Sequence, residues 1–212
     1  SFSLDLTNAT DVVTDAGSGE LIVSIGGGAP AHADSLVRVD PETGEVTGEQ
    51  QIGPNPTQLV LSADGSVLYV VVANGPGSIV KQLHTADLTL IRQFTVDDAG
   101  ALPVLQLDIS PVDSDIVAIS HDQAGALARG VSIYEDGVRR ATTYAVADAP
   151  GGLSWGSASR VYFSHGTVTD RLDVAPSGVT FASNIGGMPT SGSTSFFNGE
   201  LFFDTSSVSY NG

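Results

Sequence analysis

The chain has 212 residues, with 24 acidic against 8 basic side chains and a formal net charge of −16 at pH 7. A surface this acidic repels phosphate backbones and anionic lipid over about a Debye length of 8 Å, which argues against nucleic-acid partners and membrane insertion. Only 15% of the residues are charged and 25 are glycine. This composition suits many short strands joined by tight turns better than amphipathic helices.

Cysteine is absent, which excludes disulfides, a thiol nucleophile and a thiolate metal site but fits either redox compartment. The longest apolar run, Val67 to Ala73, is too short to span a bilayer. No basic segment followed by an apolar stretch opens the chain, which begins with Ser1 and not with Met. We therefore expect a processed or excised piece of a longer protein.

A short apolar strand, a turn rich in Asp, Gly or Ser, and a second apolar strand recur five times, and each such unit predicts a β-hairpin. Equivalent apolar positions of the second strands lie 47, 48, 45 and 40 residues apart, a period typical of β-propeller blades. The hairpins are Asp11–Ile25, Leu59–Val72, Leu107–Ser120, Leu153–Ser164 and Thr194–Asp204, and the equivalent positions are Leu21, Leu68, Ile116, Val161 and Leu201.

The rest of each unit supplies two more strands. In the first unit SLVRVD turns through PETG into EVTGEQQI, and in the second SIVKQLH turns through TADL into TLIRQFTV. Because these strands alternate apolar with polar residues, we expect partly solvated outer strands, with the more continuously apolar first two strands buried between blades. No stretch of ten residues has helical spacing of apolar positions, which excludes repeated βαβ units.

We therefore predict an all-β fold, a single β-propeller domain of about five four-stranded antiparallel blades. The predicted blades cover residues 7–53, 54–100, 101–148, 149–187 and 188–212, and residues 1–6 complete the last one. Pairing of Ser1–Leu6 with the last blade would close the ring and remove an open sheet edge. The alternative is part of a larger, six- to eight-bladed propeller. A closed ring predicts a monomer, and an open one predicts an oligomer.

One segment of the second unit, PTQLVLSADGSVLYVVVANGPGSIVKQL, resembles the YVTN-type (lactonase-like) bacterial propeller repeat. The matching residues are Pro56, Ser62, Asp64, Gly65, Leu68, Tyr69, Val70, Asn74 and Ile79. LVRVDPETGEV in the first unit is similar to another segment of that repeat. The resemblance implies an exported bacterial protein, in the periplasm, at the cell surface or outside the cell, and a propeller that usually has seven blades. Some members are lactone hydrolases, but no catalytic constellation maps onto residues of this chain.

Five polar residues follow the second strand of successive units: Ser24, Asn74, His121, His165 and Asp204. Loops that join second to third strands share one face of a propeller with the loops between blades. We therefore predict that these residues form a polar ligand-binding ring at one channel mouth. His121 and His165 could share a metal or act as acid and base, and the alternative is that each ends its strand and bonds loop backbone.

Three groups of carboxylates raise the hypothesis of a Ca²⁺ site: Asp97 with Asp98, Asp113 with Asp115, and Asp40 with Glu42 and Glu45. No D-x-D-x-D-G loop is present, and Asp favours turns because its side chain accepts backbone hydrogen bonds. The preferred interpretation is that these residues form turns. We predict no cofactor, with calcium as the alternative.

Blade repeats without a catalytic constellation predict a non-catalytic binding or scaffold module, which recognises a protein or a glycan through loops on one face. The first alternative is a lactonase-like hydrolase with a metal or His site at the channel mouth. The second is a structural spacer domain of a large surface protein. The lone Trp155 is expected to pack in the core.

Overall fold

The computed structural model describes residues 6–75, 77–96, 102–121 and 129–185, with the side chain of residue 74 excepted, and the backbone of residues 194–197 and 200–203. Within these ranges the chain forms 19 β-strands and no helix, and therefore no helix that could cross a membrane. The chain divides into two compact units, residues 1–103 and residues 104–212.

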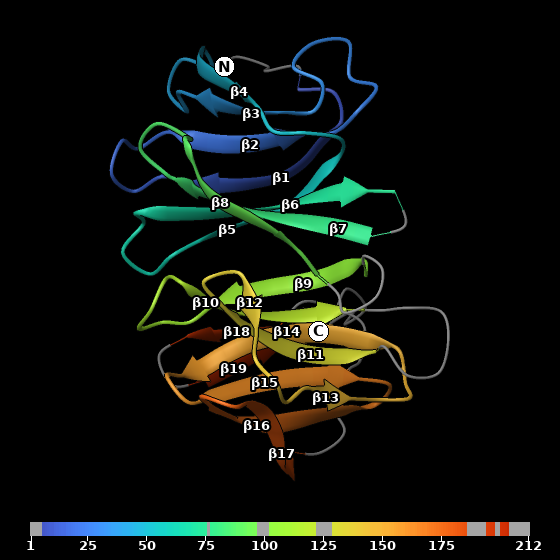
Figure 1. Ribbon diagram of the computed structural model, residues 1–212. Helices are drawn as coiled ribbons and strands as arrows, with labels where there is room; N and C mark the ends of the chain where they lie inside the picture. The colour runs from blue at the N-terminus through green and yellow to red at the C-terminus, as the bar shows by residue number, and fades with distance from the viewer. Residues whose placement is uncertain are drawn as a thin grey trace, which may run out of the picture. The chain divides into compact units, whose positions relative to one another are not determined.

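Unit 1 consists of two four-stranded antiparallel sheets in which each strand pairs with the next along the chain (Figure 1). The first sheet contains β1 (Ala9–Thr14), β2 (Leu21–Ile25), β3 (Ser35–Val39) and β4 (Val46–Gln51). The second contains β5 (Pro56–Leu61), β6 (Val67–Asn74), β7 (Gly77–His84) and β8 (Leu90–Thr95). The first strands of the two sheets, β1 and β5, lie next to each other.

Unit 2 repeats this plan. Its first sheet contains β9 (Val104–Ile109), β10 (Ile116–His121) and β11 (Gly130–Glu135), and two short strands, β12 (Val138–Arg139) and β13 (Tyr144–Ala145), both pair with β11. Its second sheet contains β14 (Pro150–Ser157), β15 (Arg160–His165), β16 (Val168–Ala175) and β17 (Gly178–Asn184). A hairpin of β18 (Thr194–Phe197) and β19 (Glu200–Phe203) follows. The first strands β9, β14 and β18 are successive neighbours.

All five predicted hairpins are confirmed, and the five equivalent apolar positions each lie at the start of a second strand. The fourth strand of the third sheet differs from the expectation, because it is divided into β12 and β13. The predicted pairing of Ser1–Leu6 with the last blade falls mostly on residues outside the described ranges. Ring closure, the single domain and the blade count therefore stay predictions.

Burial does not follow the predicted order of strands. The second and third strands are the buried ones: all five residues of β3 are buried, whereas four of the six residues of β1 and five of the six of β4 are exposed. A middle strand is hydrogen-bonded along both edges and covered on both faces, while each edge strand leaves one edge free. The expectation of a solvated third strand was therefore wrong, and that of a buried first strand fails for β1, whereas β14 has four buried residues of eight and no exposed one.

Apolar side chains hold neighbouring sheets together. In unit 1 one buried cluster joins Ile22 and Leu36 of the first sheet to Leu59, Leu68 and Leu83 of the second. In unit 2 another joins β10 and β11 of the first sheet to strands of the second sheet and includes Trp155, which is 5% exposed. The prediction that Trp155 packs in the core is confirmed. Removal of these apolar surfaces from water supplies the main force that packs sheet on sheet.

Within each unit, side chains of the first sheet's first strand, β1 or β9, also hydrogen-bond to the backbone of the second sheet's first strand, β5 or β14. In unit 1 the Asp11 carboxylate accepts from the Leu59 backbone N–H at 2.8 Å. In unit 2 the Gln106 side chain accepts from the Leu153 N–H at 2.6 Å, and Asp108 accepts from the Trp155 N–H at 2.8 Å. The Trp155 indole N–H returns a bond to the Asp108 carbonyl. Adjacent sheets are thus fixed in register as well as packed.

Replacement of Asp11 by Ala tests this link. The change leaves the Leu59 N–H without its acceptor, and we expect a loss of about 1–3 kcal/mol in the free energy of unfolding. Asp11→Asn keeps one acceptor oxygen and should lose less. Urea unfolding followed by far-ultraviolet circular dichroism measures the effect. Glu42→Ala, at an exposed turn, is the control and should change stability by under about 0.5 kcal/mol; equal losses in Asp11→Ala and the control would refute the link.

The buried Asp108 carboxyl should make the stability of the protein depend on pH. Burial raises its pKa from 3.8 to about 6, against the hydrogen bonds from the Trp155 and Ile109 N–H groups, which favour the charged form. The folded state therefore binds this proton more tightly than the unfolded state, so stability is lost as the pH rises from about 4 to about 6. The free energy of unfolding of the wild type, relative to Asp108→Asn, should fall by about 1–3 kcal/mol across this range. Urea unfolding followed by Trp155 fluorescence measures this free energy at each pH. A difference between the wild type and Asp108→Asn that does not change with pH would contradict the prediction.

Candidate functional site

The sequence places five polar residues at the exits of the second strands, and the pairing register tests whether they are equivalent. His121 ends β10 opposite Gly130, and His165 ends β15 opposite Val168. Asn74 ends β6 in the same way, opposite Gly77. Each of the three residues is the last of its strand, so the backbone register supports their equivalence.

Ser24 does not share that register. It is the penultimate residue of β2, so the equivalent position in the first sheet is Ile25. The Ser24 hydroxyl is fully buried and lies 2.7 Å from the Thr10 hydroxyl. Ser24 is thus bound within its own sheet. Asp204 lies outside the described residues, and a binding role for the five residues stays a prediction.

Each histidine bonds the third strand of its own sheet. The His121 Nε2 lies 3.1 Å from the Ser132 hydroxyl, and the His165 Nε2 lies 2.7 Å from the Asp170 carboxylate. Both imidazoles are more than nine-tenths buried. Ser132 and Asp170 occupy corresponding positions, each opposite the residue two places before the histidine. Each histidine thus ends its strand, and one partner of each is a side chain of the third strand.

Asp170 is the centre of a buried polar network in unit 2. Its carboxylate is 3% exposed and accepts hydrogen bonds from the His165 Nε2, the Tyr144 hydroxyl at 2.7 Å and the Asn184 amide at 3.0 Å. Burial raises the pKa of Tyr144, and the Asp170 carboxylate raises it further because it holds the hydroxyl proton. The Tyr144 ring packs edge-on against Phe163.

Two glycines allow Tyr144 to reach this network. The segment around β13 runs between β11 and β17, where Thr142 bridges Gly178 and Ala145 pairs with Gly130. A Cβ atom at Gly130 would collide with the Tyr144 carbonyl oxygen, and one at Gly178 would collide with that of Thr142. Both glycines also have positive φ, at 152° and 130°. Only glycine fits at these close approaches.

The other nitrogen of the His165 ring, Nδ1, lies on the side of the exposed Asp148 carboxylate. Nδ1 is buried and makes no hydrogen bond, and the carboxylate of Asp148 lies 3.7 Å away. Since an ionised Asp170 can only accept, Nε2 carries the proton and Nδ1 the lone pair in the neutral ring. A base of this kind needs a nucleophile within about 3.2 Å of Nδ1. The nearby Ser164 hydroxyl instead bonds Thr169 at 2.8 Å.

Sequence reasoning missed Tyr144, Asp170 and Asn184. For Asp170 a signal exists: SHGTVTD is a tight hairpin, and period-two alternation puts His165 and Asp170 diagonally on one face of the sheet. Tyr144 had no such signal, because its strand is two residues long and separated from β16 by more than twenty residues.

The loop face of unit 1 holds a second polar cluster, formed around the β2–β3 loop of residues 26–34. The Asn55 side chain accepts from the Gly27 N–H at 2.8 Å, and the Asp34 carboxylate accepts from the Asn55 N–H at 2.9 Å. Asn8, His32, Asp34 and Asn55 all have positive φ, between 44° and 65°. A left-handed backbone conformation at a residue other than glycine is unfavourable by roughly 1 kcal/mol, and it persists where surrounding contacts fix it.

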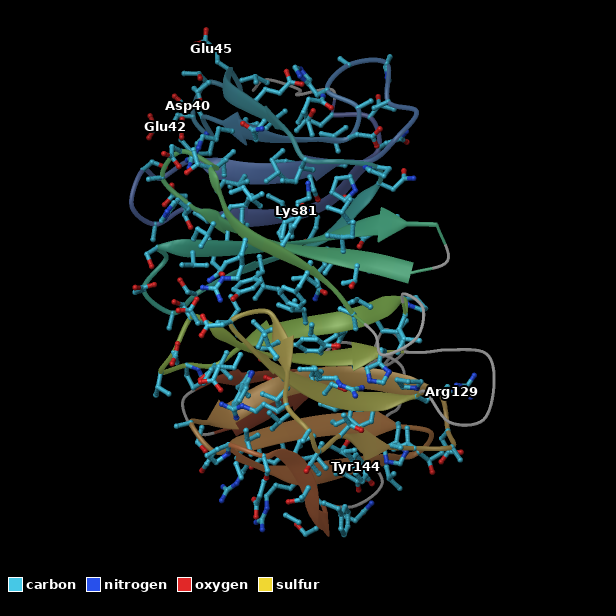
Figure 2. The ribbon with its side chains drawn as sticks, in the orientation of Figure 1. Asp40, Glu42, Glu45, Lys81, Arg129 and Tyr144 are labelled. Atoms are coloured by element: carbon cyan, nitrogen blue, oxygen red, sulfur yellow. The ribbon has the colours of Figure 1, made fainter. Side chains whose placement is uncertain are left out.

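The carboxylate groups named as calcium candidates behave as turn formers where they are described. Asp40 accepts from the Glu42 and Thr43 N–H groups, and Asp113 accepts from the Asp115 N–H. Figure 2 shows Glu42 and Glu45 extending away from the β3–β4 turn. Among the described residues no three His, Asp or Glu side chains are grouped so as to hold a metal ion. Asp97 and Asp98 lie outside these residues.

No protein family and no curated protein sequence matches this chain. Solved structures match its fold: hydrazine synthase of Kuenenia stuttgartiensis with a TM-score of 0.64 at 19% identity, and a chain of the mitotic checkpoint complex with 0.61 at 15%. Both are β-propellers. The chain has a β-propeller fold.

The propeller matches cover most of this chain but only part of the others. The match to hydrazine synthase covers 86% of this chain and 50% of the hydrazine synthase chain. The match to the checkpoint-complex chain covers 83% of this chain and 54% of that one. A functionally unknown protein from Desulfotomaculum acetoxidans matches with a TM-score of 0.65 at 14% identity, over 88% and 58%. The chain therefore spans about half the length of the structures it matches.

Asp170→Ala tests the buried network. The change leaves the donors of His165, Tyr144 and Asn184 without their shared acceptor, and we expect a loss of about 3 kcal/mol or more in the free energy of unfolding. The matched control is Asp148→Ala, on the other side of the same imidazole, where the carboxylate is 65% exposed and the expected loss is under about 1 kcal/mol. Chemical unfolding of both variants decides; similar losses would contradict the network.

Proposed function

We propose that this chain is a non-catalytic interaction module of an exported bacterial protein, which recognises a protein or a glycan through the loops at the second-to-third-strand end of its sheets. The β2–β3 loop is the observation that carries this proposal. It is joined to the second sheet of unit 1 by the bonds of Asn55 with Gly27 and Asp34. A loop held in one conformation binds without the entropic cost of ordering, which favours recognition.

The His121 side chain supports a structural role in its sheet, because its Nε2 lies 3.1 Å from the Ser132 hydroxyl of the neighbouring strand. The comparison with a chain of the mitotic checkpoint complex adds support for a protein partner, because that propeller acts within a protein assembly. Location at the cell surface, in the periplasm or outside the cell is part of the proposal and rests on the resemblance to exported propellers.

We also propose kinship with the YVTN-type repeat, on the evidence of the β5–β6 turn. Asp64 accepts from the Ser62 hydroxyl at 2.6 Å and from the Ser66 N–H at 3.0 Å, and Gly65 has a φ of 72°. The hydrogen bond from the Ser62 hydroxyl has the largest effect on the Asp64 carboxyl, and those from Ser66 have the next largest. Together they lower the pKa of Asp64 to about 2. The S-x-D-G motif is thus a turn that closes the first hairpin of a blade, which is why a repeat would retain it.

The test of function is a binding screen with matched variants. The full chain is applied to a glycan array and to a displayed peptide library, and each binder is titrated against the wild type, Asn55→Ala and Glu42→Ala. Asn55→Ala releases the β2–β3 loop and should weaken binding about tenfold. Glu42→Ala lies at the turn end of the first sheet and should change it less than about twofold. Binders that tolerate Asn55→Ala, or no binder in either screen, would overturn the proposal.

A second candidate, a lactonase-like hydrolase, is favoured by one observation, the Asp170–His165 pair with its unpartnered Nδ1. Asp170 would orient the imidazole, and Nδ1 would take a proton from water. Turnover of a panel of aliphatic lactones by the wild type, abolished in His165→Gln, would establish this function in place of the first. Absence of turnover in the wild type would exclude it for those substrates.

A further inference from the structure

A pocket of about 690 Å³ opens in unit 1 at the end of the sheets opposite the β2–β3 loop. Its walls come from the β1–β2 turn, the β5–β6 turn and the β7–β8 turn, so both sheets of the unit contribute. The pocket therefore lies away from the face where sequence reasoning placed the ligand.

Arg38 is the cation at the base of this pocket. Its guanidinium is 10% exposed and lies 3.0 Å from the carboxylates of Asp15 and Glu20. It also donates to the Thr85 carbonyl oxygen of the neighbouring sheet. Burial opposes the charge of Asp15, but the hydrogen bonds from Arg38, Ser18 and the Gly17 N–H outweigh it and lower the pKa of that carboxyl. Asp15 is therefore held in its charged form.

The pocket holds more negative than positive charge. The hydrogen bond from the Thr47 hydroxyl, outweighing burial and aided by Arg38, lowers the pKa of Glu20. Hydrogen bonds from the Thr89 hydroxyl and N–H lower the pKa of Asp87 on the opposite wall. Three carboxylates thus line the pocket beside one guanidinium and the imidazole of His84, within a protein whose net charge is −16. A positively charged occupant is favoured on electrostatic grounds.

A second observation points to a ligand with hydrogen-bond donors. Thr85 is 2% exposed and lines the pocket, and its hydroxyl oxygen makes no hydrogen bond. Buried polar atoms without a partner are uncommon in native proteins. A donor that enters from the pocket would satisfy this oxygen together with the carboxylate wall.

The chemistry of the walls narrows the kind of cation. The described His, Asp and Glu residues form no group of three that could hold a metal ion, so the three carboxylates of the pocket do not make up a metal site by themselves. No Phe, Tyr or Trp side chain lines the pocket, so a sugar ring has no platform of that kind on which to stack. An ammonium or guanidinium group on a flexible stem fits both facts, because it forms several hydrogen bonds to spaced acceptors.

We propose that this pocket receives a Lys or Arg side chain of a protein partner, as a second contact site on the opposite end of the blades. The proposal rests on the interaction-module function and gives it a partner class: a protein with an exposed basic residue. The binding screen with Asn55→Ala tests the β2–β3 loop face. The pocket is tested separately, with short peptides and with Asp87→Asn.

The test is a nuclear magnetic resonance titration of the full chain with three capped tripeptides, acetyl-Gly-X-Gly-amide with X as Lys, Arg or norleucine. We expect the Lys and Arg peptides to shift the backbone amide signals of Ser66, Ala86 and Asp87, and the norleucine peptide to leave them unchanged. Asp87→Asn should weaken binding of the basic peptides about fivefold, because it removes one charge from the wall and keeps an oxygen for Thr89.

Asp113→Asn is the matched control. Asp113 bonds the N–H two residues further on in an exposed turn of unit 2, as Asp87 does in unit 1, and the substitution removes the same charge from the protein. Its effect on affinity should be under about twofold. Equal weakening by the two variants, shifts with the norleucine peptide, or no shift with either basic peptide would overturn the proposal. A binder whose affinity depends on Asn55 but not on Asp87 would leave the loop-face function standing alone.

Discussion

The structure depends on the contact between the first strands of neighbouring sheets. A four-stranded sheet with two apolar faces cannot remain in water alone, and within each unit the first sheet is packed on the second and linked to it by hydrogen bonds. Asp11 reaches the backbone of the next sheet in unit 1, and Gln106 and Asp108 do so in unit 2. Packing alone permits sliding. Side-chain bonds to specific backbone N–H groups remove that freedom and fix where every loop emerges.

Because the first strands are fixed, the two ends of the sheets are rigid supports with different chemistry. At the loop end Asn55 and Asp34 hold the long β2–β3 connection against the second sheet. At the turn end Arg38 joins the sheets through the Thr85 carbonyl and gathers carboxylates around a pocket. Loops on a rigid support can vary in sequence without disturbing the core, so binding sites are commonly built in such places.

The buried network of unit 2 shows how charge is accommodated inside a small blade. Asp170 has three donors around its carboxylate, which replace the water that burial removes. Burial raises the pKa of the Asp108 carboxyl to about 6. Its hydrogen bonds come chiefly from backbone N–H groups.

The sequence by itself determined the elements that local pattern controls. Apolar runs of period two, separated by Asp, Gly and Ser, specify hairpins without help from distant residues, so the β5–β6 turn of Ser62, Asp64 and Gly65 and the repeat length were predictable. Burial was not, since a strand's cover depends on its place in the sheet and on the neighbouring sheet. Tertiary structure alone decided that Tyr144 meets Asp170 and that Arg38 faces Thr85, because these residues belong to different sheets or distant strands and no spacing in the sequence encodes their meeting.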